Sequence, residues 1–124
     1  MKIIICVALL TLALIGHPRA VSYIATEQLT IDNTAGGVGF TAAKITPSGL
    51  PQATTAVCKL ETAQVRYQIN GPPSSAPTAP TTTLGTPWDV GETRTFNGHD
   101  ILVNFRAIRT GASSGVANCD YSAP

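Results

Sequence analysis

The chain has 124 residues, a length typical of one domain. Its formal charge is only +1, so it lacks the excess of basic residues that is typical of nucleic-acid-binding proteins. Setting aside Lys2 and Arg19, which belong to the N-terminal leader, leaves six basic and seven acidic residues and a net charge of −1. About 100 remaining residues can bury roughly two thirds of their unfolded surface, so one modest core is feasible.

The N-terminal leader comprises residues 1–22, in which Lys2 precedes an uncharged apolar run over residues 3–16. This run is shorter than the roughly 18 to 20 apolar residues that cross a bilayer, so it resembles a secretory signal peptide and no stable membrane span is expected. Ala20 and Ser22 supply small residues at positions −3 and −1 for cleavage after Ser22. The alternative is a misassigned start of translation.

Residues 63–70 carry the clearest strand pattern. Side chains alternate between the two faces of a strand, and the alternation here predicts a sheet with one face in solvent. Three earlier strands are predicted over residues 25–31, 38–45 and 54–62, with a bend, a bulge or one continuous strand near residue 62. The residues expected on the buried face of the 63–70 strand are Ala63, Val65, Tyr67 and Ile69.

A loop rich in proline and threonine follows over residues 71–83. Its prolines cannot donate ladder hydrogen bonds, so the loop is expected to lie exposed. The next link, residues 86–91, contains Trp88, which is interpreted first as a cap on the core and second as an interface or ligand contact. Both links separate strands and predict no regular structure of their own.

Asn97-Gly98 predicts a β-hairpin between strands over residues 92–96 and 100–108, because this dipeptide tolerates the positive φ of tight turns. The alternation of inward and outward side chains is broken after Ala107. This predicts a β-bulge that changes the direction in which an arginine side chain points. Arg106 and Arg109 are therefore candidate interface anchors, and the alternative is that both are solvated on the outer face.

The final strand is predicted over residues 116–121, and no segment shows a helical period with caps. About seven short strands joined by glycine, proline, serine and threonine turns predict an all-β fold. We expect residues 23–124 to form a single antiparallel β-sandwich, either jelly-roll or immunoglobulin-like.

Three cysteines are present, and Cys6 would leave with a cleaved leader. Cys58 and Cys119 lie on the apolar faces of their predicted strands. Two alternatives stay open for this pair: a disulfide in an exported protein, or two buried free thiols.

Reactive side chains are scarce, so no catalytic, cofactor or metal site is predicted and the protein is not expected to be an enzyme. His99 is the one histidine after the leader, and its place after the turn suggests solvent exposure. No nucleophile elbow activates a serine, and zinc requires more ligands than two lone thiols. A small hydrolase would need a buried His99 beside a serine.

Several motifs follow one another along the chain: Val38-Gly-Phe-Thr-Ala-Ala43, Leu60-Glu-Thr-Ala-Gln-Val-Arg-Tyr67 with Asn70-Gly71, Gly98-His-Asp, Asn104-Phe-Arg-Ala-Ile-Arg-Thr-Gly111, Ser114-Gly115 and Tyr121. In this order they resemble a family of small structural proteins of tailed bacteriophage virions. The resemblance covers roughly residues 28–121 and implies a non-enzymatic β-sandwich that decorates or stabilises the head or tail, packed on capsid or tail proteins and on copies of itself. The leader and the long Pro/Thr loop depart from that pattern.

The leader favours a different hypothesis, because tailed-phage virions assemble in the cytoplasm. In this alternative the protein is an exported periplasmic or cell-surface binding module. Its partner could be a glycan, stacked on Trp88, Tyr67 or Tyr121.

Overall fold

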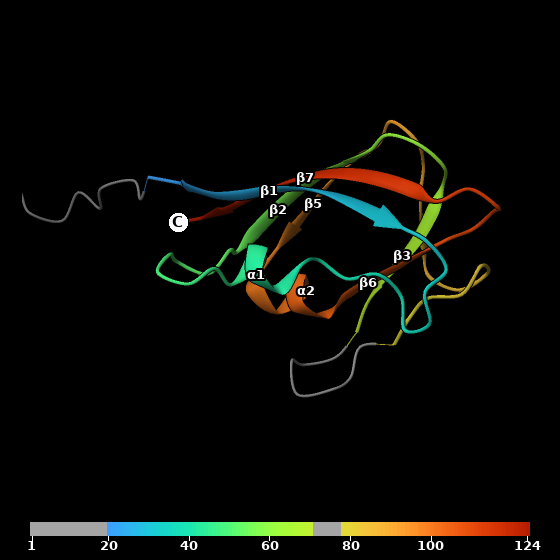
Figure 1. The fold of residues 1–124 in the computed structure, drawn as a ribbon, viewed down its shortest axis with the longest axis horizontal. Coiled ribbons are helices and arrows are strands. Elements are labelled where there is room, and N and C mark those ends of the chain that lie inside the picture. The colour runs from blue at the N-terminus through green and yellow to red at the C-terminus, as the bar shows by residue number, and fades with distance from the viewer. Residues whose placement is uncertain (1–19, 71–77) are drawn as a thin grey trace, which may run out of the picture.

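Two antiparallel sheets pack face to face in the computed structural model, which describes residues 20–70 and 78–124 (Figure 1). Seven strands and two short helices make up this part of the chain, and the predicted antiparallel sandwich is confirmed. The elements are β1 (Ser22–Ile31), α1 (Ala42–Ile45), β2 (Thr55–Leu60), β3 (Val65–Ile69), β4 (Thr86–Trp88), β5 (Thr93–Asn97), α2 (His99–Asn104), β6 (Phe105–Arg109) and β7 (Gly115–Ala123).

Sheet A has the strand order β1-β7-β2-β5, and sheet B has the order β4-β3-β6. All strand pairs are antiparallel, and the last strand lies between the first two. In the immunoglobulin order the first two strands are neighbours in one sheet, so this sandwich has a different connectivity. The chain changes sheets between β2 and β3, between β4 and β5, through α2, and between β6 and β7.

The core lies between the sheets and is built around aromatic rings. Phe40 stacks on Phe105 with ring centroids 4.3 Å apart, and Phe96 meets Phe105 edge-on at 5.1 Å. Such pairs add to the stability that apolar burial provides. The alternation predicted for the third strand is confirmed, because Ala56, Cys58 and Leu60 are all buried.

The strand predicted over residues 38–45 is wrong. Val38 forms one isolated bridge to Ala107, and residues 42–45 form the single turn of α1. A strand would send Phe40 and Ile45 to opposite faces because their positions differ by an odd number. The helical turn brings both side chains into the core, where they are 7% and 3% exposed.

The hairpin predicted at Asn97-Gly98 is also wrong. β5 pairs with β2, and α2 carries the chain from sheet A to sheet B. Gly98 does adopt positive φ (116°), but it leads into the helix and not into a returning strand. The apolar run before Phe105 lacks alternation, and a helical turn buries Leu102 completely.

The bulge predicted near Arg106 is absent, since β3 and β6 pair in unbroken register from Val65 opposite Arg109 to Ile69 opposite Phe105. A register shift occurs instead in β1, between Tyr23 and Ala25. Residues 71–77 of the Pro/Thr loop lie outside the described residues. Pro80, in the described remainder of that loop, is buried, whereas residues 81–83 are exposed as expected.

Candidate interaction surface

Cys58 on β2 and Cys119 on β7 lie directly opposite each other and are joined by a disulfide. Their Cα atoms are 4.1 Å apart, and both side chains lie on the inner face of sheet A with at most 1% exposure. Of the two alternatives that the sequence left open, the structure has the bridge and not the free thiols. The disulfide links two residues that are 61 positions apart in the sequence.

The aromatic residues considered for ligand stacking are mostly inside the protein. Trp88 is fully buried, donates its indole N–H to the carbonyl of Glu92 at 3.0 Å, and packs edge-on against Tyr67 and Phe96. It is a core residue, so its assignment to an interface is wrong. Tyr121 is equally buried, and Tyr67 is half-buried beneath the guanidinium of Arg94.

The hydroxyl of Tyr121 is held by a polar group that reaches into the sandwich. It donates a hydrogen bond to the carboxylate of Glu27, which also accepts the backbone N–H of Thr41 at 3.3 Å. Burial, and then the neighbouring carboxylate, raises the pKa of Tyr121 well above its usual range. Glu27 thus ties β1 to β7 and to the start of α1.

Arg106 and Arg109 are half-buried, and their side chains form hydrogen bonds with backbone groups close by in the sequence. The Arg106 guanidinium donates to the carbonyls of Val103 and Phe105, and that of Arg109 donates to the carbonyl of Ala112 at 2.7 Å. These bonds hold the start and end of β6. The structure thus assigns both guanidinium groups an intramolecular role, and an interface role stays a prediction.

His99 is half-buried at the start of α2, not fully exposed. Its Nδ1 lies 3.0 Å from the backbone carbonyl of Ala53, which fixes the ring. No serine hydroxyl or carboxylate is hydrogen-bonded to this imidazole in the described part of the chain. The geometry that a hydrolase would require is therefore not assembled around His99.

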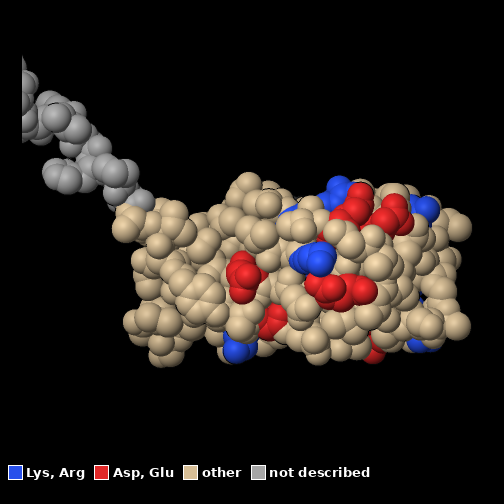
Figure 2. Space-filling view, turned by 90° about the horizontal axis from the view of Figure 1, so that it is seen from above, with Lys and Arg blue, Asp and Glu red and all other residues tan. Residues whose placement is uncertain are grey.

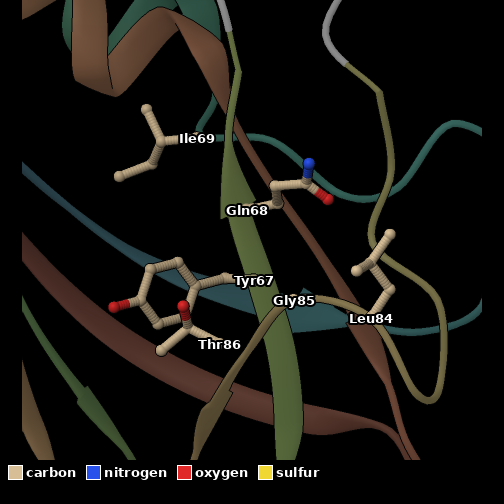
Figure 3. A pocket seen from close by; sticks show the side chains of 6 residues that line it. All are labelled: Tyr67, Gln68, Ile69, Leu84, Gly85 and Thr86. Atoms are coloured by element: carbon tan, nitrogen blue, oxygen red, sulfur yellow. The ribbon is translucent and has the colours of Figure 1, made fainter.

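An open pocket of about 480 Å³ lies where β3 meets β4, lined by the six residues shown in Figure 3. The side chains of Tyr67 and Ile69 extend to one side of β3, whereas Gln68 lies on the other with Leu84 (Figure 3). Because these groups do not converge, the pocket offers no set of polar contacts around a small molecule.

The solvent-exposed face of sheet A is a regular surface formed by four strands. Its four strands present mostly hydroxyl and amide side chains, and some pair across strands, as Thr55 does with Asn97 at 3.2 Å. Lys59 and Asp120 are its charged members. The face consists of Tyr23, Thr26, Gln28, Thr30, Thr55, Val57, Lys59, Thr93, Thr95, Asn97, Val116, Asn118, Asp120 and Ser122.

One end of this face carries no charged side chain and is partly apolar. Val21, Tyr23 and Leu50 are 74%, 65% and 54% exposed, and residues 20–26 and 45–58 contain no charged side chain. In Figure 2 the end of the tan surface next to the grey residues shows no Lys, Arg, Asp or Glu, and the charged groups gather farther along. Tyr23 is the one aromatic side chain in the described ranges that lies mainly in solvent.

Comparison with known proteins finds no match: no protein-family model, no curated protein and no solved structure. Within residues 20–70 and 78–124, no helix is long and apolar enough to span a membrane. In the same ranges no three His, Cys, Asp or Glu side chains gather as a metal site requires.

Proposed function

We propose that this protein is a non-enzymatic interaction module that works outside the reducing cytoplasm after export. The observation that supports this proposal best is the Cys58–Cys119 disulfide inside sheet A. Disulfides persist in the periplasm, in secreted proteins and on cell or virion surfaces, and they are rare in the cytosol. The apolar leader over residues 1–22 supports the same location.

Recognition would use the solvent-exposed face of sheet A. Its hydroxyl and amide groups can donate and accept hydrogen bonds, and its low charge suits a neutral partner. A neutral glycan fits this chemistry, with Tyr23 as the stacking ring in place of the buried Trp88 and Tyr121.

The location is tested by expressing the full-length gene, fractionating the cells, and measuring the mass and amino terminus of the product. We expect a protein outside the cytoplasm that begins at Tyr23, with Cys58 and Cys119 resistant to alkylation until a reductant is added. An intact chain in the cytoplasm with both thiols free would refute the proposal.

The proposed binding of a neutral glycan is tested separately, by measuring the retention of the protein on immobilised neutral polysaccharides. Tyr23→Ala is expected to lower retention by about fivefold, because aromatic stacking contributes roughly 1 kcal/mol beyond area burial. Leu50→Ala, at the same end but off the sheet face, is the matched control. Equal retention by the two variants would exclude Tyr23 as the contact.

A second candidate function is the virion accessory role that the sequence resemblance implies. The two open edges of sheet A, β1 and β5, favour it, because repeated copies on a lattice can cover such edges by strand addition. Mass spectrometry of purified particles should then find the protein in many copies. Its absence from particles would leave only the exported module.

A further inference from the structure

Among the strands in residues 20–70 and 78–124, β1 is the longest, and within these ranges it pairs on one side alone, with β7. Facing residues of two antiparallel strands alternate between pairs joined by backbone hydrogen bonds and closer pairs without such bonds, whose Cα atoms are about 4.5 Å apart. The Cα atoms of Cys58 and Cys119 are 4.1 Å apart, so their backbone groups are not hydrogen-bonded to each other. The backbone groups of Cys119 therefore point to β1, where it faces Glu27. Backbone groups alternate in direction along β7, and the carbonyl of Ser122 accordingly points toward β2. There it accepts a hydrogen bond from the backbone N–H of Thr54 at 2.9 Å.

It follows that the residues beside Glu27 direct their N–H and C=O groups away from β7, off the edge of the sheet. These residues are Thr26, Gln28 and Thr30, and all three are exposed. In the described part of the chain, none of their backbone groups makes a hydrogen bond beyond the β1–β7 pairing. The edge is thus a row of unused donors and acceptors.

Proteins usually protect such an edge with lysine, proline or a bulge. β1 contains neither lysine nor proline, and its bulge lies near its start, between Tyr23 and Ala25. Its one charged residue, Glu27, is turned to the inner face and bonded to Tyr121. The small side chains of Ala42 and Ala43 are exposed at the neighbouring helix α1, which Thr41 holds beside β1.

The regular part of β1, residues 25–31, is centred on Gln28, whose backbone groups point off the edge. We propose that a second copy of this chain adds to the β1 edge about a two-fold axis at Gln28. Gln28 would then pair with its own counterpart, and Thr26 of each copy would pair with Thr30 of the other. Two four-stranded sheets become one continuous sheet, in the symmetry most common among dimers.

On the solvent-exposed face, the side chains that meet across this axis are uncharged, and on the inner face Glu27 lies opposite Leu29 of the other copy, so no like charges stand directly opposite each other. The opposite edge, β5, is half as long, with five residues against ten. This pairing uses only the β1 edge and does not require export of the protein.

The first experiment measures the mass of the full chain by light scattering over a concentration series. We expect a dimer, and we expect Gln28→Lys to convert it to a monomer because two ammonium groups would face each other at the axis. Thr95→Lys places the same charge on the β5 edge and should stay dimeric. A monomer at every concentration, or dissociation by Thr95→Lys alone, would overturn the proposal.

The second experiment tests the register and does not depend on how the lysine variant folds. In a Cys6→Ser background, Gln28→Cys should form a covalent dimer on non-reducing gels, since hydrogen-bonded pairs have Cα atoms about 5.5 Å apart, within disulfide range. Thr30→Cys lies on the same edge, but its two copies would be about 13 Å apart along the strands. Equal cross-linking of the two variants, or none by Gln28→Cys, would contradict the two-fold axis.

Discussion

At Gly115, the lack of a side chain allows the two sheets to approach each other closely. This residue is buried at the start of β7, and a Cβ there would lie 2.9 Å from the carbonyl of Ala63 and collide with a methyl group of Val65. Its φ is not positive, so packing and not backbone conformation requires glycine at this position.

Gly115→Ala should therefore lower the free energy of unfolding by about 1–3 kcal/mol, the usual cost of overpacking a core. Gly111→Ala, in the adjacent loop with no atom within 4 Å of the added carbon, is the matched control and should be near neutral. Urea unfolding of the two variants makes the comparison. Equal stability would show that β7 can move away from Val65.

Tyr121 predicts a dependence of stability on alkaline pH. Its pKa in the folded protein is raised above the value of about 10 that it has when unfolded, so its contribution is complete below pH 10 and declines as the pH rises above that value. At neutral pH, Tyr121→Phe should cost about 1.5–3 kcal/mol through the lost bond to the carboxylate of Glu27.

The test is urea unfolding from about pH 8 to about pH 11, on both sides of the ordinary tyrosine pKa. The difference between the wild type and Tyr121→Phe should shrink at the alkaline end, because only the wild type must keep this hydroxyl protonated. A constant difference across the range would mean that the hydroxyl does not titrate with unfolding.

At the scale of elements, α2 performs the task that the sequence suggested for a hairpin. It links β5 in sheet A to β6 in sheet B, and Leu102 anchors it in the core with no exposed surface. Leu102→Ala should cost about 2–5 kcal/mol, as expected for a large buried side chain. Ile101→Ala, on the same helix but half-buried, should cost clearly less, and thermal unfolding of both variants measures the difference.

At the scale of the whole molecule, the disulfide constrains the unfolded chain across a separation of 61 positions. A closed loop of that length corresponds to about 4 kcal/mol of loop entropy in the chain-entropy model. Replacing both cysteines, Cys58→Ala with Cys119→Ala, should lower the unfolding free energy by roughly that amount. A loss well under about 1 kcal/mol would mean that the unfolded chain without the disulfide retains structure that already restricts it.

Sequence patterning predicted the sandwich and the inward faces of several strands, because the alternation that buries Val65 and Cys58 is local and repeats every two residues. It also placed both cysteines on apolar faces and interpreted Trp88 as a core residue. Its errors at residues 38–45 and at Asn97-Gly98 share one cause. Turn and strand propensities describe a few neighbouring residues, whereas burying Phe40 with Ile45, and pairing β5 with β2, depends on distant partners.

The amino-acid order alone determined an all-β domain that is nearly neutral and poor in reactive groups, since composition and periodicity are properties of the chain itself. Tertiary structure decided which strands are neighbours, that Cys58 meets Cys119, and that Tyr23 is exposed while Trp88 and Tyr121 are buried. It also decided which backbone groups of β1 point off the sheet. The physical reason is register: a shift of one residue would turn every side chain and backbone group to the other side, and only contacts between distant segments choose one register.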